Sequence, residues 1–162
     1  MREKVTVTEK LTIEKYKSHA DRLANKPYEV VEEVCIGGIN CLLNAGITEI
    51  WNLVINASTY HPDNTNAQLG VGDSDTAADA AQTDLQAAVN KDYNAMDASY
   101  PIVADQTVTF SATFGSAEAN FAWNECAVRY GAAGTVFNRI VSAKGTKVDG
   151  EEWVARLAIT LS

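Results

Sequence analysis

Residues 95–161 follow the hydrophobic pattern of consecutive β-strands joined by turns. From Thr107 to Phe114 polar and apolar side chains alternate one by one, which is the pattern of a strand with one buried face. Further apolar runs follow, and turn-forming residues separate them at the spacing found in β-sandwiches. The sequence therefore predicts a mainly β protein, with an antiparallel β-sandwich or jelly-roll-like domain over about 67–162. The runs lie at 121–130, 136–141 and 153–161, and the turns at 114–116, 131–134, 144–145 and 149–150.

The N-terminal region has a different pattern. Its first part alternates through Val5 and Val7 and continues to Leu11 and Ile13, which predicts a strand or an extended arm that pairs with an edge strand of a neighbouring molecule. Residues 14–26 are rich in helix-forming types up to Pro27, which predicts a helix that stops there. We therefore expect an arm and helix over 1–37, followed by a helix and the β-sandwich over 38–162.

A second helix is predicted between residues 39 and 54 by an apolar stripe at near-helical spacing. Gly46 lies within this stripe and weakens the helix prediction, so a break there that divides the segment into two short helices is an alternative. Trp51 stands beside the stripe, and tryptophan favours contacts between proteins, so it is a candidate interface residue. A short strand is expected at 67–72 and a short helix at 83–89. The stripe consists of Ile39, Leu42, Leu43, Ile47, Ile50, Leu53 and Val54.

The net charge of −8 excludes some partners and comes mainly from one segment. Residues 63–97 hold seven aspartates against Lys91, whereas residues 1–34 carry seven acidic and seven basic groups. Such an acidic surface repels phosphate backbones, so we expect no nucleic-acid partner. No apolar run reaches the roughly 18 residues of a membrane helix, and the first residues lack the apolar core of a signal peptide. We expect no membrane partner and synthesis in the cytoplasm.

The acidic segment contains a weak metal-binding pattern. Asp73, Asp75 and Asp84 occupy positions 1, 3 and 12 of a calcium-binding loop. The pattern then fails, because Ala77 and Ala78 stand where an oxygen ligand and a glycine are required. The alternative is that these aspartates hold turns through hydrogen bonds to the backbone. We assign no metal and no cofactor, and leave open whether the segment holds a cation.

The remaining chemistry-bearing residues do not form a catalytic pattern. Cys35, Cys41 and Cys126 lack the CxxC spacing of a zinc site and are expected to be reduced thiols. The carboxylate pairs at 32–33 and 151–152 are adjacent in the chain, so they do not face a common centre. We therefore expect that the protein is not an enzyme. Trp123 and Trp153 lie in apolar runs typical of a core, although exposed tryptophans would favour a glycan-binding protein.

Five stretches of the sequence are informative when taken in order: GITEIWNLVIN, NAQLGVGDSDTAADAAQTDLQAA, YNAMDASYP, QTVTFSATFGSAEANFAWNECAV and FNRIVSAKGTK. Together they resemble a family of tailed-bacteriophage structural proteins. The resemblance runs from about Gly38 to Ser162. It implies a virion component made in the bacterial host, most plausibly an auxiliary capsid protein (a decoration or cement protein) that stabilises the capsid surface.

The resemblance also implies partners. These are the major capsid protein and neighbouring copies of the same chain, arranged as a homotrimer. The alternative is a tail or fibre attachment protein that binds a host receptor or glycan. A rival of another class is a hydrolase, which requires two carboxylates opposed across a cleft. No residue role is transferred from the family, so the interface candidates are Val5, Val7, Leu11, Ile13 and Trp51.

Overall fold

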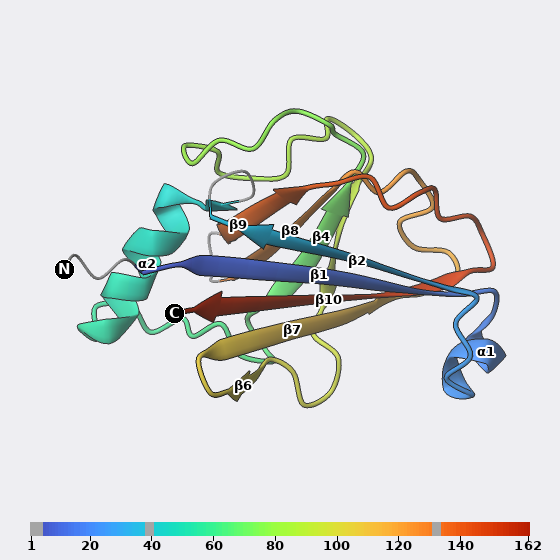
Figure 1. Ribbon diagram of the computed structural model, residues 1–162, viewed down its shortest axis with the longest axis horizontal. Coiled ribbons are helices and arrows are strands. Elements are labelled where there is room, and N and C mark those ends of the chain that lie inside the picture. The colour runs from blue at the N-terminus through green and yellow to red at the C-terminus, as the bar shows by residue number, and fades with distance from the viewer. Residues whose placement is uncertain (1–4, 38–40, 131–133) are drawn as a thin grey trace.

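The protein is a two-layer β-sandwich, seen in a computed structural model that describes residues 5–37, 41–130 and 134–162 (Figure 1). Within these residues the strands form two antiparallel five-stranded sheets, which confirms the mainly β prediction. The first sheet has the order β2 (Glu29–Ile36), β1 (Val7–Tyr16), β10 (Glu152–Leu161), β7 (Thr107–Phe114) and β6 (Ile102–Ala104). The second has the order β3 (Cys41–Leu42), β9 (Thr135–Val141), β8 (Glu125–Tyr130), β4 (Gln68–Gly72) and β5 (Lys91–Ala95).

The core lies between the two sheets and follows the alternation of the strands. Leu11 on β1 is opposite Leu157 on β10, which is opposite Phe110 on β7, and all three side chains are buried. Trp123 and Trp153 extend this core, with their rings edge to face and their centroids 4.9 Å apart. Buried apolar area of this kind is the main stabilising contribution in a domain of this size.

The N-terminal segment is part of the sandwich, so of the two alternatives predicted for its first part the strand is confirmed and the arm is wrong. The strands in the described part of residues 1–37 therefore belong to the same sheet as β10. β1 lies inside its sheet, paired with β10 over residues 7–16 and with β2 over residues 8–15. The predicted helix over 14–26 is also wrong, because β1 extends to Tyr16 and α1 (His19–Leu23) is short. Pairing with the distant strand β10 outweighs the local helix-forming composition.

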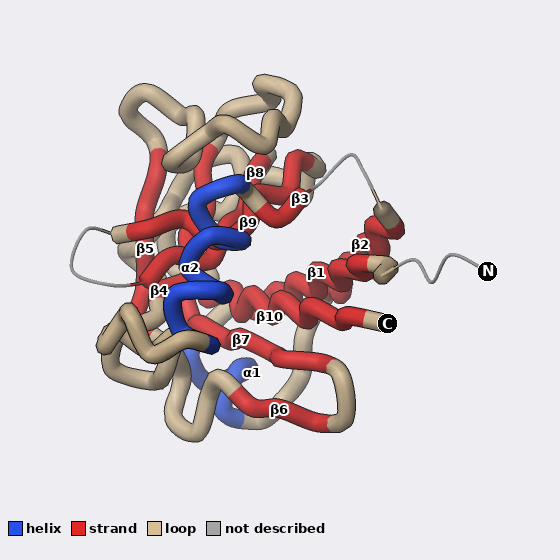
Figure 2. The backbone as a smooth tube through the Cα atoms, turned by 90° about the vertical axis from the view of Figure 1, so that its left-hand side faces the viewer, coloured by secondary structure: helices blue, strands red, loops and turns tan. Residues whose placement is uncertain are grey.

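Helix α2 (Asn44–Val54) lies at the end of the sandwich where β1 begins and β10 ends (Figures 1 and 2). It is one continuous helix, so the alternative with a break at Gly46 is wrong. Gly46 is buried against the backbone of Phe137 on β9, where any Cβ atom would clash. The glycine is therefore needed for close packing of helix on strand rather than for a turn.

Residues 73–90 run as a loop over the outer face of the second sheet, and the predicted helix at 83–89 does not form. Leu85 and Ala87 are buried under this loop. The expected strand at 67–72 is confirmed as β4. Two sequence predictions, Ile39 in the apolar stripe and the turn at 131–134, involve residues 38–40 and 131–133, which lie outside the described residues.

Candidate functional site

An apolar stripe on α2 faces solvent instead of the core. Its members recur at i, i+4, i+7 and i+8, the spacing of one helix face. Trp51, at the centre of the stripe, is 63% exposed. An apolar helix face of this kind is normally buried, so its exposure indicates a binding surface. We call this stripe, Ile47, Trp51, Val54 and Ile55, the α2 face.

The sequence around α2 explains why this stripe points outward. Leu43, the residue before the helix, is fully buried, and its amide donates to the Phe137 carbonyl oxygen. Gly46 seats the first turn directly on β9. These two contacts fix the side of the helix that meets the sandwich, and the rest of the apolar stripe is left in solvent.

A pocket of about 320 Å³ opens beside the α2 face. Its walls come from both sheets and from the helix, so it is an incompletely filled part of the space between the layers. Most of its lining is apolar, and the polar lining residues lie in the turn between β6 and β7 and at the first residue of β7. The apolar lining includes Leu42, Ile50, Val103, Phe137 and Ile159, and the polar residues are Asp105, Gln106 and Thr107.

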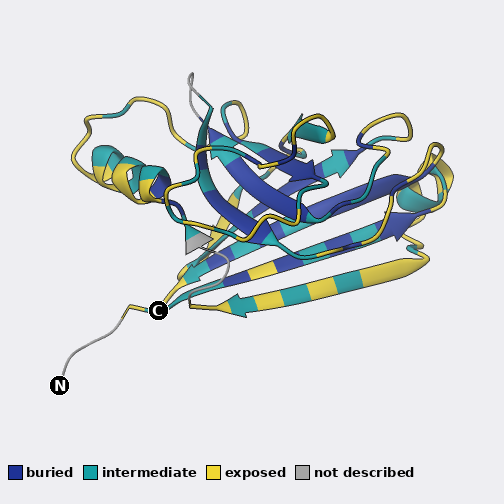
Figure 3. Ribbon diagram, turned by 90° about the horizontal axis from the view of Figure 1, so that it is seen from above, coloured by how far each residue is buried: buried dark blue, intermediate teal, exposed yellow. Residues whose placement is uncertain are grey.

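Strand β2 forms a second exposed apolar surface. Among the described residues it is hydrogen-bonded to a strand on one side only, where β1 lies. Glu33 and Cys35, its inward residues, are opposite the buried Leu11 and Glu9, so the residues between them face outward. Figure 3 shows this strand alternating between exposed and intermediate along its length. Glu32 also lies on this outward face. We call β2 with its outward apolar residues Val30, Val34 and Ile36, which are all exposed, the β2 edge.

The glutamates of β2 are each paired with a lysine. Lys15 binds Glu29 at 2.6 Å, Lys10 binds Glu32 at 2.8 Å and Lys144 binds Glu33 at 3.0 Å. The Ser142 hydroxyl and the Lys144 ammonium group lower the pKa of Glu33. Because these charges are compensated within the chain, the β2 edge presents main chain and apolar side chains without a strong field of its own.

The predicted metal-binding aspartates are not brought together. Asp84 is bound by Lys91 at 2.7 Å and by the Tyr93 hydroxyl at 2.5 Å, and Asp73 accepts a hydrogen bond from Asn90 at 2.7 Å. Burial acts to raise the pKa of Asp84, but the Lys91 and Tyr93 contacts prevail and lower it. Within the described residues no group of three or more acidic, histidine or cysteine side chains could hold a metal ion.

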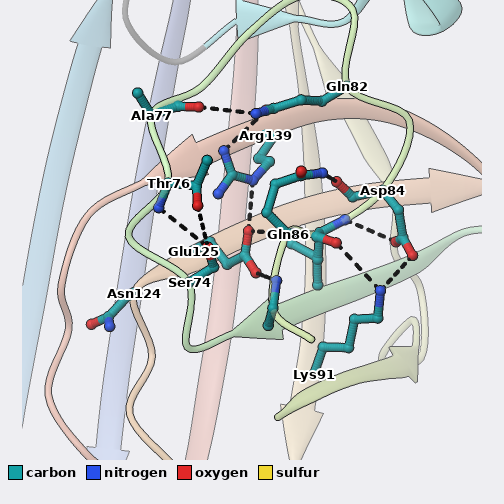
Figure 4. A network of polar contacts seen from close by, with 12 residues as sticks. Ser74, Thr76, Ala77, Gln82, Asp84, Gln86, Lys91, Asn124, Glu125 and Arg139 are labelled. Atoms are coloured by element: carbon teal, nitrogen blue, oxygen red, sulfur yellow. Dashed lines mark hydrogen bonds and ion pairs between the residues drawn. The ribbon is translucent and has the colours of Figure 1, made fainter. Parts of the chain in front are cut away.

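A buried polar network fixes the loop of residues 73–90 to the second sheet (Figure 4). Glu125 on β8 and Arg139 on β9 form a fully buried ion pair at 2.6 Å. The Glu125 carboxylate also accepts hydrogen bonds from the backbone amides of Gln86 and Ala87, at 2.9 and 2.8 Å. Arg139 donates to Gln82 at 3.0 Å. Each carboxylate oxygen of Glu125 is used in holding the loop, so this pair has a structural part to play.

The other side chains considered for binding or catalysis are buried or paired within the chain. Trp123 and Trp153 are each 1% exposed, so neither can stack on a sugar. Glu151 is bound by Lys17 at 2.5 Å, and Glu152 by His19 at 3.0 Å and by Arg22. Burial raises the pKa of the Cys126 thiol to about 12, so this thiol stays protonated at neutral pH.

The interface candidates predicted from sequence separate into three groups. The prediction that Leu11 and Ile13 lie at an interface is wrong, because both side chains lie in the core of their own chain. Val7 packs partly against that core, and Val5 is exposed beside it. Trp51 is exposed at the centre of the α2 face. The β2 edge was not predicted, although Val30, Val34 and Ile36 are spaced by even numbers of residues, which could have indicated one face of a strand.

No helix among the described residues is long and apolar enough to cross a membrane. Searches of the chain against protein-family models, curated proteins and solved structures gave no match. The function is therefore argued from the two surfaces and from the sequence resemblance.

Proposed function

We propose that this protein is a non-catalytic structural protein that binds other proteins, and that it serves as an auxiliary component on the capsid surface of a tailed bacteriophage. The sequence resemblance supports the virion setting. The exposed surfaces of the sandwich support a role in assembly. A jelly-roll-like topology was part of the sequence prediction, but this proposal does not depend on it.

The observation that carries the proposal is the β2 edge. A strand edge with unpaired main-chain groups can accept an extended segment of another protein as an additional strand. Natural proteins usually protect such an edge with charged side chains, a proline, a bulge or a covering segment. Here β2 runs for eight residues, its glutamates are paired with lysines, and Ile36 is 70% exposed. These features support the proposal that the edge accepts an additional strand.

The partner that fits this edge is an extended segment of the major capsid protein. Main-chain hydrogen bonds to β2 would supply affinity along the strand. Apolar side chains of the segment would cover Val30, Val34 and Ile36, which lie two or four residues apart on the same face. The strand-addition role first expected for residues 1–13 is therefore transferred to β2, because β1 already has a strand on each side.

The test is binding of the purified protein to capsids of the phage that encodes it. Val34→Lys places a charge on the outward face of the edge, and we expect it to reduce the amount bound at least about 10-fold. The matched control is Val89→Lys, because Val89 is also an exposed valine but lies in the loop over the other sheet. We expect the control to bind like the unmodified protein.

Thermal unfolding of both variants separates loss of binding from loss of fold. We expect both to unfold within a few degrees of the unmodified protein, because both positions are exposed. Equal capsid binding by Val34→Lys and by the unmodified protein would show that the β2 edge is not the docking surface. A protein that binds no capsid, but is found on purified tails, would instead support the attachment function.

A further inference from the structure

We propose that copies of this chain associate through the α2 face, with Trp51 of one copy inserted into the pocket of the next. This contact is separate from the β2 edge and does not depend on the proposed capsid function. It assigns an occupant, the indole ring of a second copy, to a pocket that the fold leaves open.

The protrusion and the pocket are neighbours on the molecule, at the same helix. Ile50 lines the pocket, and Trp51 is the next residue along the same helix. A surface that carries both a protruding group and a complementary hollow can bind its own copy, either reciprocally about a two-fold axis or head to tail around a ring. Val103, 76% exposed, stands on the pocket wall, where an entering ring would bury it.

The size and chemistry of the pocket fit an indole ring. Its volume of about 320 Å³ is at the lower end of the range for ligand pockets, roughly 300–1,000 Å³, which suits one large aromatic group. Its apolar walls match the ring, and the oxygen atoms of Gln106 and Thr107 at the polar side are acceptors of the kind that an indole N–H requires. Aromatic anchors in apolar pockets are the usual centres of binding energy in interfaces.

Charge also favours a second copy as the occupant. The chain carries a net charge of −8, so most of its surface repels an identical molecule. Residues 43–62, which include the whole of α2, contain Glu49 as their one charged side chain, apart from the neutral His61. The turn beside the pocket adds Asp105. The α2 face is therefore a place where two copies can meet with little repulsion.

The first test is sedimentation velocity of the full chain over a range of concentrations. We expect a concentration-dependent dimer or ring, and we expect Trp51→Ala to weaken association at least about 30-fold, as for the central residue of an interface. Val103→Asp, which adds a charge at the pocket wall, should weaken association similarly. Val89→Asp is the matched control, since Val89 is exposed and remote in sequence from the pocket residues, and it should leave association unchanged.

Fluorescence provides a second measurement that does not depend on mutation. Trp51 is exposed whereas Trp123 and Trp153 are buried, so quenching by acrylamide in the dissociated protein should come from Trp51. Association should protect it and shift its emission to shorter wavelength.

Three results would overturn the proposal. The first is a monomer at all concentrations. The second is a self-association that Trp51→Ala leaves unchanged. The third is an association weakened by Trp51→Ala but not by Val103→Asp, which would place Trp51 outside the pocket.

Binding of free indole tests the pocket separately. We expect indole to compete with association of the chains. Binding of indole by a chain that stays monomeric would instead show that the pocket takes a small molecule. Capsid binding is measured independently, so failure here would leave the proposed function standing.

Discussion

Glu9 and Lys147 show how two buried charges are treated differently in the same sandwich. The Lys147 ammonium group is surrounded by oxygen atoms and donates to Gly115, Glu118 and Asn120 at 2.7, 2.9 and 2.8 Å. Glu9 on β1 is only 1% exposed, and neither of its carboxylate oxygens has a hydrogen-bond partner in the described part of the chain. A buried carboxylate without a partner is costly, so the fold favours the protonated form of Glu9.

The surroundings of Glu9 make its protonation depend on folding. Burial raises the pKa of Glu9 from 4.5 to about 7, against a smaller lowering by the Asn138 amide. Between these two pH values the folded chain binds the proton more tightly than the unfolded chain. The contribution of the protonated group is therefore complete below about pH 4.5 and is lost as the pH rises through about 7.

The first prediction concerns Glu9→Gln, which removes this titration with little change in shape. As the pH rises from about 4 to about 8, the unmodified protein loses the contribution of protonated Glu9, whereas the variant has no such contribution to lose. We therefore expect the free energy of unfolding of the variant minus that of the unmodified protein to rise by about 3 kcal/mol over this range. Urea unfolding at both pH values measures this difference. Glu32→Gln is the control, because Glu32 is solvated and paired with Lys10, and it should show no such rise. A constant difference for Glu9→Gln across this range would contradict the account of Glu9.

At the scale of single elements, strand β1 determines whether the sandwich can form. It lies between β2 and β10, and its Leu11 and Ile13 are completely or almost completely buried. Removing it would leave β2 without its neighbour and would expose one flank of β10. The N-terminal strand is therefore a central part of the sheet.

Deletion of residues 1–13 is accordingly expected to unfold the domain. Each buried Leu or Ile side chain contributes about 1.5–3 kcal/mol to the free energy of unfolding. The deletion removes two such side chains together with most of an interior strand, and the resulting loss is comparable to the total stability of an ordinary domain, about 5–15 kcal/mol. Circular dichroism and thermal unfolding of the truncated chain test this directly. A truncated protein that still unfolds cooperatively near the temperature of the full chain would show that β1 is dispensable.

The elements that the sequence predicted well are those whose pattern is local. The alternation from Thr107 to Phe114 corresponds to β7, because successive side chains of a strand point in turn to the core and to the outer side of the sheet. The helix expected at 83–89 failed because Leu85 and Ala87 are buried two residues apart, and the backbone amides of Gln86 and Ala87 are bound by the distant Glu125. Non-local contacts of this kind leave no periodic trace in the segment itself.

At the scale of the whole molecule, the two candidate surfaces depend on strand pairing and helix packing that cannot be predicted from the sequence pattern alone. Trp51 could be proposed from its residue type and its place beside an apolar stripe. That the stripe faces solvent depends on Leu43 and Gly46 meeting β9. The β2 edge depends on which strands find a second neighbour, and the pocket on how the two layers meet at one end.

The two surfaces also give the molecule a consistent arrangement for assembly. The α2 face lies at one end of the sandwich and the β2 edge along its side (Figures 1 and 3). Copies joined at α2 would each retain a β2 edge for a capsid segment. Linking binding sites in this way raises the overall affinity of the assembly well above that of one site.

The measurement that tests the central claim most directly is cryo-electron microscopy of the intact virion. The account predicts density for this chain at repeated symmetric positions on the capsid, with a capsid segment lying along β2 as an additional strand. Density confined to the tail, or a particle without this chain, would contradict it.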